Sequence, residues 1–343
     1  MQTETVAIIS TVLNERGSIS GLLDGFLSQT RKADEIIIVD GGSTDGTLEI
    51  LKEYAQRHPN IHYVVAQGVN IARGRNIAIS CARSSIIAAT DGGCHPEQIW
   101  LEELVKPLLN DPSYGAVSGV RKVEHVNQFE FFAGALSTSG NSTNEEDRVF
   151  HGRNSAFRKS IWVEVGGYPE WLYTAEDTLF AQRAKALGCR VAVAPNAVIS
   201  WRPRPNLKKL AKQYYLYGKG TGRIGQANLQ AAFYHLRNHA IWMISFLVGF
   251  FFPGFWLVSL FMLTFMYTTL INPVLQKLKQ NGFNNTGLYF YVPIIVMVRS
   301  LYNNLGQLYG NWEYNQVEPF KENYQQYISG NWKMLNIDNS YEA

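Results

Sequence analysis

The sequence predicts an α/β fold with a Rossmann-like, mostly parallel sheet and flanking helices, followed by helices in a membrane. Ahead of about residue 230, short apolar runs rich in β-branched residues alternate with amphipathic segments. This alternation is typical of a parallel sheet joined by right-handed crossovers. Farther on, no charged residue occurs from Ala240 to Asn272. At about 1.5 Å per helical residue, that run exceeds the roughly 30 Å of a bilayer's hydrocarbon core.

The individual elements follow from local patterns. Apolar β-branched runs predict strands, and apolar residues three and four apart predict helices. The expected strands are Val6–Thr11, Glu35–Asp40, Ile61–Val65, Ile86–Thr90, Ala116–Val123, Val191–Ala194 and Val198–Trp201. The expected helices are Ser18–Gln29, Asp45–Gln56, Asn70–Ala82, one that begins with Pro96, and Ala175–Leu187. Residues 124–148 show no period and are expected to form a mobile loop over a site.

Asp40 ends the second expected strand, where open α/β sheets hold their ligands. The two glycines after it allow a tight turn and a close approach to a bound group. One of the next three residues, Ser43, Thr44 or Asp45, is expected to cap the following helix. The pattern leaves two interpretations open: an ordinary strand–turn–helix joint, or a contact between Asp40 and a nucleotide.

Asp91 ends the fourth expected strand and should therefore face the same crevice as Asp40. An aspartate beside glycines can bind a divalent cation that bridges a diphosphate. A turn aspartate that accepts a hydrogen bond from its own backbone fits the pattern equally well.

Glu176 and Asp177 form an acid pair at the start of an expected helix. One of these carboxylates could act as a general base that takes a proton from an attacking hydroxyl. Alternatively, Thr174 and Asp177 have the spacing of a capping box, and acidic residues in a first turn favour the helix dipole. Spacing alone does not separate the two interpretations.

Arginines occur at two places that matter. Arg73 and Arg75 cannot share one helical face, so at most one should reach the crevice and the other should be solvated. A basic, tyrosine-rich stretch precedes the uncharged run, and it is expected to contact anionic lipid or phosphate. Its basic members are Arg202, Arg204, Lys208, Lys209, Lys212, Lys219 and Arg223.

Charge and cysteine usage exclude several classes of protein. The formal net charge of +3 is too small to suggest a nucleic-acid partner. The cysteines Cys81, Cys94 and Cys189 are odd in number and far apart, which argues against a disulfide framework and a zinc site. The first apolar run is short and follows Glu4, so no secretory signal is expected.

Five motifs in this order resemble the inverting, family-two glycosyltransferases of the membrane-associated bacterial type, which have the GT-A fold. The motifs are Val6–Glu15, Ile36–Thr47, Ala72–Asn76, Thr90–Gly93, and Gly166–Tyr168 with Ala175–Asp177. The resemblance implies that Thr11 and Glu15 lie at the nucleoside of a nucleotide-sugar donor, and that Asp40 contacts its base. Arg75 would lie near the base or the phosphates.

The resemblance also implies how the reaction would proceed. Asp91, with Gly92 beside it, would face the diphosphate and its Mg²⁺ or Mn²⁺ ion. Asp177, with Glu176 beside it, would be the general base for direct displacement at the anomeric carbon, which inverts the configuration.

Three departures from the family pattern affect these expectations. Gly93 stands in place of the second aspartate of the D-x-D motif, although one carboxylate can hold Mg²⁺ when phosphates and water complete its ligands. Arg202 and Arg204 occupy the place of a histidine found in many members, and one of them could neutralise the leaving diphosphate. The Q-x-x-R-W motif of processive synthases is absent from residues 213–220, which favours transfer of a single sugar.

The expected organisation is a catalytic domain at residues 1–230, two or three membrane helices at 240–310, and a tail at 311–343. The catalytic domain is expected on the cytoplasmic face of the inner membrane, and with that orientation Lys277 and Lys279 after the uncharged run favour a return of the chain to the cytoplasm under the positive-inside rule.

The leading hypothesis is an enzyme that transfers one sugar from a nucleotide-sugar donor to a lipid-linked or membrane-near glycan acceptor. Membrane lipid is a further expected partner, and nucleic acid is not. A nucleotidylyltransferase is the chemical alternative, but Asn14–Gly17 is a poor match to the Gly-rich basic loop that it would need. A catalytically inactive membrane protein that binds sugar nucleotides is the other alternative, supported by Gly93 alone.

Overall fold

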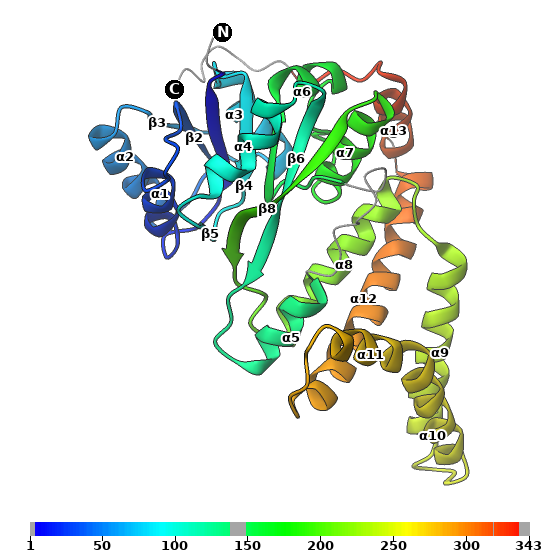
Figure 1. Cartoon of the computed structure of the whole chain (residues 1–343). Helices are drawn as coiled ribbons and strands as arrows, with labels where there is room; N and C mark the ends of the chain where they lie inside the picture. The colour runs from blue at the N-terminus through cyan, green and yellow to red at the C-terminus, as the bar shows by residue number, and fades with distance from the viewer. Residues whose placement is uncertain (1–3, 138–148, 318, 336–343) are drawn as a thin grey trace. The chain divides into compact units, whose positions relative to one another are not determined.

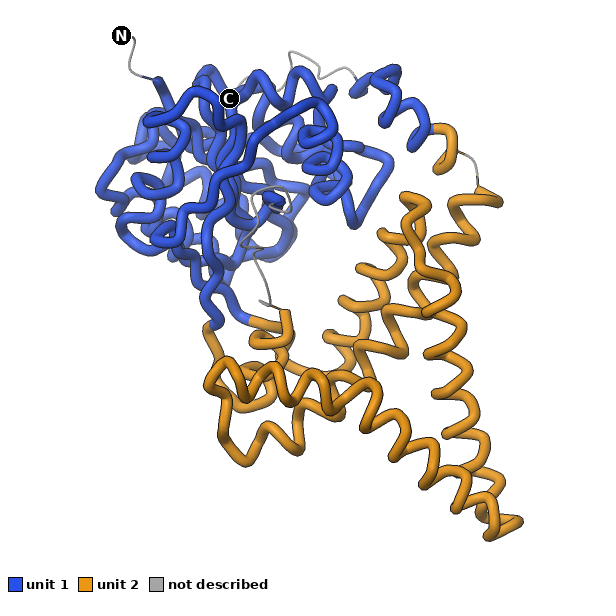
Figure 2. The backbone as a smooth tube through the Cα atoms, turned by 45° about the vertical axis from the view of Figure 1, so that its right-hand side comes forward, with its two compact units in different colours: residues 1–123, 140–202, 323–343 blue, residues 124–139, 203–322 orange. Residues whose placement is uncertain are grey.

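The computed structural model describes residues 4–137, 149–317 and 319–335. The chain divides into two compact units. Unit 1 comprises residues 1–123, 140–202 and 323–343, and unit 2 comprises residues 124–139 and 203–322 (Figure 2). The chain therefore leaves unit 1 twice and returns to it at its C-terminal end.

Unit 1 is built on an eight-stranded sheet of order β3-β2-β1-β4-β7-β6-β8-β5 (Figure 1). The strands are β1 (Val6–Val12), β2 (Glu35–Asp40), β3 (Ile61–Val65), β4 (Ile86–Thr90), β5 (Cys94–Pro96), β6 (Tyr114–Val123), β7 (Asn154–Arg158) and β8 (Arg190–Trp201). Of these, β7 and β5 run antiparallel to their neighbours, and the others share one direction. The expected α/β fold with a mostly parallel, Rossmann-like sheet is confirmed.

Apolar side chains from the sheet and from three helices, α1 (Ile19–Leu27), α2 (Thr47–Arg57) and α4 (Trp100–Asn110), form the main core of unit 1. The helices of this unit also include α3 (Ile71–Cys81), α6 (Lys159–Val165) and α7 (Glu176–Ala186). The predicted apolar face of α1 is buried, and its Phe26 stacks on Trp100 of α4 with ring centroids 6.2 Å apart. This core holds the strand ends that carry the candidate site residues.

Three expectations about elements were wrong. Pro96 ends the short strand β5, and the next helix begins only at Trp100. Residues 191–194 and 198–201 belong to one strand, β8, whose pairing with β6 shifts register between them. Within the expected mobile loop, Gln128–Ser137 forms the helix α5, while residues 138–148 lie outside the described residues.

Unit 2 is helical. Besides α5 it contains α8 (Leu207–Arg223), α9 (Leu229–Val248), α10 (Phe255–Met266), a π-helical segment (Tyr267–Ile271), α11 (Asn272–Gln280) and α12 (Leu288–Gln316). Helices α8 and α12 pack closely because glycines face the partner's backbone. A Cβ at Gly306 or Gly310 of α12 would collide with a carbonyl oxygen of α8, and a Cβ at Gly218 would collide with one of α12.

The last helix, α13 (Phe320–Ser329), leads the chain back into unit 1. The Tyr327 hydroxyl donates a hydrogen bond to the carbonyl oxygen of Gly167 at 2.7 Å, and its side chain is 1% exposed. Met334 fills the space that a Cβ on Gly167 would need. The C-terminal segment (residues 323–335) is therefore part of the packed structure of unit 1.

Candidate active site

The candidate site lies where β4, α3 and α7 meet. Asp91 directly follows β4, Arg75 lies on α3, and Glu176 begins α7. Helix α3 can approach β1 closely because Gly74 faces Thr11, where a Cβ would come within 2.8 Å of the Thr11 Cγ2. This close approach brings the next residue, Arg75, to the end of the sheet.

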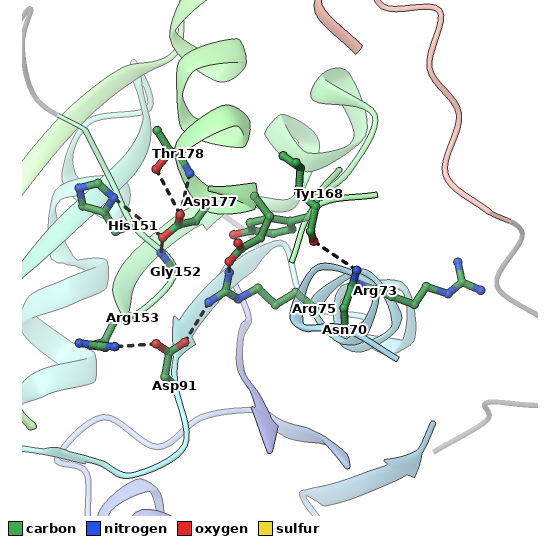
Figure 3. Close-up of polar contacts among 12 residues, drawn as sticks. Asn70, Arg73, Arg75, Asp91, His151, Gly152, Arg153, Tyr168, Asp177 and Thr178 are labelled. Carbon is green, nitrogen blue, oxygen red and sulfur yellow. Dashed lines mark hydrogen bonds and ion pairs between the residues drawn. The ribbon is translucent and has the colours of Figure 1, made fainter. Parts of the chain in front are cut away.

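Arg75 links two of the predicted acidic residues. Its Nη2 donates to Asp91 Oδ1 at 2.9 Å, and its Nη1 donates to Glu176 Oε1 at 2.8 Å (Figure 3). Its guanidinium also lies over the Tyr168 ring, 5.3 Å from the centroid. The guanidinium is buried, so these charge-assisted hydrogen bonds are shielded from water.

Arg153 is a further member of the site that the sequence interpretation missed. Its Nε donates to Asp91 Oδ2 at 3.1 Å, and its guanidinium lies 4.7 Å from the centroid of Trp201. The antiparallel pairing of Thr90 with Asn154 explains this position, since it brings the residue before β7 opposite the residue after β4. Only that pairing could have identified Arg153, and a parallel-sheet pattern does not predict it.

The two arginines hold the pKa of the Asp91 carboxyl below its usual value, against the effect of burial. Both oxygens of Asp91 are therefore charged acceptors at neutral pH. In contrast, burial and the neighbouring Asp177 raise the pKa of Glu176 to about 7, although Arg75 opposes the shift.

The acid pair differs in exposure and in hydrogen bonding. The Asp177 side chain is 26% exposed and the Glu176 side chain 7% exposed. Asp177 accepts hydrogen bonds from the backbone N–H of Gly152 at 3.2 Å and of Thr178 at 2.7 Å. The His151 Nδ1 lies 3.9 Å from Asp177 Oδ2.

The alternative interpretation of the acid pair as a capping box was wrong. The N-cap of α7 is Ala175, not Thr174, and no side chain caps the helix there. Ala175 adopts φ +69°, a left-handed conformation that costs a non-glycine residue on the order of 1 kcal/mol. Such strain concentrates at functional sites. Here the strained residue directly precedes Glu176 and Asp177, so it determines how the chain enters α7.

Asp40 lies in a different hydrogen-bond network. It is 1% exposed, and its carboxylate accepts hydrogen bonds from the Ser43 backbone N–H at 3.1 Å and from the Ser43 hydroxyl at 2.5 Å. Ser43 in turn accepts the backbone N–H of Asn14 at 2.8 Å. The turn after β2 is thereby joined to the turn after β1, and the contact of Asp40 with a base stays a prediction.

The expected cap of α2 was wrong in detail. The N-cap residue is Gly46, at φ +100°, rather than Ser43, Thr44 or Asp45. Asp45 nevertheless accepts the backbone N–H of Thr47 at 3.1 Å, so its carboxylate satisfies one donor of the first turn.

Glu15 covers the two glycines after Asp91. A Cβ on Gly92 would lie 3.2 Å from Glu15 Cγ, and a Cβ on Gly93 would lie 3.7 Å from Glu15 Oε2. The Glu15 carboxylate thus occupies the space beside Gly93, where a second aspartate side chain would begin. Ser18 Oγ donates to the same Oε2 at 2.5 Å.

Carboxylate oxygens at this turn are of the kind that a hard divalent cation prefers, although both Asp91 oxygens accept arginine N–H groups in this structure. Mg²⁺ and similar ions are commonly held by one or two carboxylates, with phosphates and water as the remaining ligands. Asp91 and Glu15 supply two carboxylates. No group of three or more His, Cys, Asp or Glu residues suited to a metal occurs among residues 4–137, 149–317 and 319–335, so the phosphates of a ligand would have to complete the site.

The other predicted arginines lie apart from this cluster. Arg73 is not solvated as expected: its Nη1 donates to Glu170 at 3.1 Å and to the Leu335 carbonyl oxygen at 2.6 Å. Arg202 is exposed directly after β8. Arg204 belongs to unit 2, and a role of either residue at a leaving diphosphate stays a prediction.

Comparisons with known proteins agree with the motifs. The chain matches the family described as "Glycosyl transferase family 2" over residues 7–166. It also matches "Glycosyl transferase family group 2" over residues 97–301, and this second match covers more than half of the chain.

Two curated relatives illustrate the similarity. Glycosyltransferase AglE of Haloferax volcanii is 27% identical over 228 residues, covering 63% of this chain and 72% of the relative. The succinoglycan biosynthesis protein ExoA of Rhizobium meliloti is 28% identical over 235 residues, covering 63% and 68% respectively.

A mannosyltransferase structure illustrates the similarity in fold. It is PcManGT from Pyrobaculum calidifontis, in complex with GDP-Man and Mn²⁺. The TM-score is 0.60 and the identity 22%, and the match covers 91% of this chain and 88% of that chain. The expected GT-A fold is thereby confirmed.

Proposed function

This chain belongs to glycosyl transferase family 2, and from that premise we propose that it transfers a single sugar from a nucleotide-sugar donor to a lipid-linked or membrane-near glycan acceptor. The transfer inverts the anomeric configuration, and Asp177 is the general base. The observation that carries this proposal is the different environment of the two adjacent acids. The Glu176 carboxylate already accepts a hydrogen bond from Arg75. The Asp177 side chain is partly exposed to water, and among the described contacts no arginine donates a hydrogen bond to its carboxylate.

Asp177 suits the role of base for three physical reasons. Two backbone N–H groups fix its orientation, so the carboxylate is held before an acceptor hydroxyl arrives. Its exposed surface leaves room for that hydroxyl. Glu176 is buried and already accepts the Arg75 hydrogen bond, so it serves instead to hold Arg75.

Arg75 and Arg153 place two positive charges beside Asp91. We assign the donor diphosphate to this place, since guanidinium groups bind phosphate oxygens with paired hydrogen bonds. Asp91 and Glu15 would hold the divalent cation, which when bound supplies positive charge to the leaving diphosphate. The similarity in fold to a protein that binds GDP-Man and Mn²⁺ supports a nucleotide-sugar donor and a cation of this kind.

The names of the relatives support a glycan acceptor. Besides ExoA they include the O-antigen chain rhamnosyltransferase WbaN of Salmonella anatum, 27% identical over 201 residues. One helix among the described residues, Phe255–Gln280, has the length and apolar composition of a membrane helix. We therefore propose an inner-membrane protein whose catalytic unit faces the cytoplasm.

The test is transfer by the purified protein, with a panel of labelled nucleotide sugars and membrane lipid extracts as acceptors. Asp177→Asn should lower kcat by about 10²–10⁴-fold, the usual contribution of a general base, with little change in the affinity for the donor. The anomeric configuration of the product, read by NMR, tests inversion. Thr174→Ala, a change in the same loop, is the control. Unchanged turnover in Asp177→Asn would remove the base assignment.

A further inference from the structure

Helices α9 and α10 form a hairpin whose two arms are held together by contacts of Trp256. Trp256 of α10 donates its Nε1–H to the Phe246 carbonyl oxygen of α9 at 3.3 Å, and its ring lies 5.6 Å from that of Phe250. A Cβ on Gly249 would collide with the Trp256 ring, so this glycine makes room for it. The chain reverses between these contacts, at residues 250–254.

The surface of this hairpin is apolar and uncovered. Phe251 is 82% exposed, Leu257 73% and Phe261 67%. The other large apolar side chains exposed between Ala240 and the end of α10 are Ile241, Met243, Ile244, Phe246, Leu247, Phe250, Phe252, Phe255, Trp256, Val258, Leu260 and Leu263. In water a surface of this kind is strongly unfavourable, and lipid is the solvent in which it is stable.

The first arm of the hairpin is too short to cross a bilayer. Its uncharged part runs from Ala240 to the tip at Phe252, and 13 residues at about 1.5 Å each span about 20 Å, less than the roughly 30 Å of the hydrocarbon core. The tip itself, Phe250–Phe252 followed by Pro253 and Gly254, carries no charged or polar side chain. A turn that emerged on the far side would place three exposed phenylalanines in water.

The charges lie at the other end of the hairpin. Arg237 precedes the uncharged run on α9, and Lys277 and Lys279 follow it on α11. Because the chain reverses at the tip, the two segments that carry these charges lie at the same end of the hairpin. Their positive charges suit the anionic headgroups of one leaflet.

We propose that the α9–α10 hairpin enters a single phospholipid leaflet and returns to the side it came from, with its phenylalanine tip near the middle of the bilayer. It would anchor the protein without crossing the membrane. This inference does not depend on the catalytic proposal.

The experiment is cysteine labelling in membranes. In full-length protein with Cys81→Ala, Cys94→Ala and Cys189→Ala, single cysteines are introduced as Phe252→Cys at the tip and as Phe233→Cys and Gln280→Cys on the flanks. A membrane-impermeant maleimide is added to right-side-out and to inside-out vesicles. We expect the tip to react in neither preparation and to react after detergent, whereas both flanks react in the same preparation.

Two results would overturn the proposal. Labelling of the tip from the side opposite the flanks would show a hairpin that crosses the membrane. Labelling of the tip from the side of the flanks would show one that stays in water.

A second measurement uses charge. Phe251→Lys should weaken binding of the protein to vesicles of phosphatidylglycerol and phosphatidylcholine by about 100-fold, since a lysine in the hydrocarbon costs about 2.5–3.5 kcal/mol. Val163→Lys, at a similarly exposed apolar residue of α6, is the control and should leave binding unchanged. Equal binding of the two variants would contradict insertion of the tip.

Discussion

Arg75 connects motifs that are 101 and 16 residues away along the chain, at Glu176 and Asp91. Helix α3 delivers its guanidinium between the two carboxylates because Gly74 lets the helix approach β1. Removing a buried arginine of this kind leaves two carboxylates with less compensation, which is costly in a low-dielectric site. Arg75 thereby joins the start of α7 to the end of β4. The position of Glu176 therefore depends on the positive charge of Arg75.

Glu176 should make stability depend on pH in a specific direction. Its pKa is raised to about 7 in the folded chain, compared with about 4.3 when unfolded. The protonated form therefore favours folding: this stability is fully present below about pH 4.3 and is lost as the pH rises through 7. Between pH 5 and 8, the free energy of unfolding of the wild type should fall by on the order of 2 kcal/mol more than that of Glu176→Gln.

Chemical denaturation in detergent at each pH measures this difference. Glu170→Gln, which removes a different buried acid, is the comparison variant. Parallel pH profiles for the wild type and Glu176→Gln would contradict the raised pKa.

Glu15 should contribute to cation binding in place of the aspartate missing at position 93. We expect Glu15→Gln to weaken Mn²⁺ binding in the presence of a nucleoside diphosphate roughly tenfold or more, because the site loses one of two carboxylates. Adding Gly93→Asp to that variant should restore much of the affinity. Aspartate tolerates the left-handed conformation of Gly93, at φ +71°, better than most residues do.

Electron paramagnetic resonance of Mn²⁺, with GDP and UDP tested separately, gives the affinity without relying on turnover. Equal Mn²⁺ affinity in the wild type and Glu15→Gln would assign Glu15 to another role, such as the nucleoside contact implied by the family resemblance.

At the scale of elements, the α8–α12 pair depends on glycine. A Cβ on Gly310 would collide with the carbonyl oxygen of Lys219, which is backbone and cannot move aside alone. Gly310→Ala should therefore lower the free energy of unfolding by about 1–3 kcal/mol, the usual cost of overpacking, despite the better helix propensity of alanine.

Gly254→Ala is a matched control, because a Cβ there meets no atom within 4 Å and the backbone is helical. Thermal unfolding in detergent measures both variants, and Gly254→Ala should be neutral. A Gly310→Ala variant as stable as Gly254→Ala would show that the helices can separate without cost.

Strands and helices with a regular pattern could be predicted from the sequence. The strand Glu35–Asp40 matches β2 at both ends, and α3 differs from its prediction by one residue at each end. Predictions failed where a distant contact decides the local structure. Pro96 lies in a strand because β8 pairs with it, and Arg73 is held by Glu170 and the C-terminal segment. Neither partner is visible in the local sequence.

The same reason limits the prediction of the site. Glu176, Asp177 and Asp91 could be named from motifs, and Asp91 and Glu176 do share Arg75. Arg153 could not, because its position follows from the antiparallel strand β7. The position of Glu15 over Gly92 and Gly93 depends on loop geometry that no spacing encodes.

At the scale of the whole molecule, unit 1 is assembled from segments separated by unit 2. Tyr327 is the fully buried aromatic side chain of the last segment, and its ring should be essential to unit 1. Tyr327→Ala should lower the free energy of unfolding by about 3–5 kcal/mol, as expected for loss of a large buried aromatic side chain. Tyr327→Phe should cost about 1 kcal/mol, because only the hydrogen bond to Gly167 is lost.

The neighbouring Ile328 is 44% exposed, so Ile328→Ala should change stability by less than about 0.5 kcal/mol. Thermal unfolding of the three variants in detergent provides the comparison. If Tyr327→Ala were as stable as Ile328→Ala, the C-terminal segment would be dispensable for unit 1.

The late return of the chain to unit 1 has a consequence during protein synthesis. The last strand of the sheet ends at Trp201, but Tyr327 is translated more than a hundred residues later, on the order of ten seconds at usual rates of synthesis. In that interval the ribosome produces residues 203–322 of unit 2, including the α9–α10 hairpin, while the Gly166–Tyr168 turn still lacks its contact with Tyr327. We expect the nascent enzyme to meet the lipid before its active site is complete, so that maturation of the catalytic unit follows delivery to the membrane.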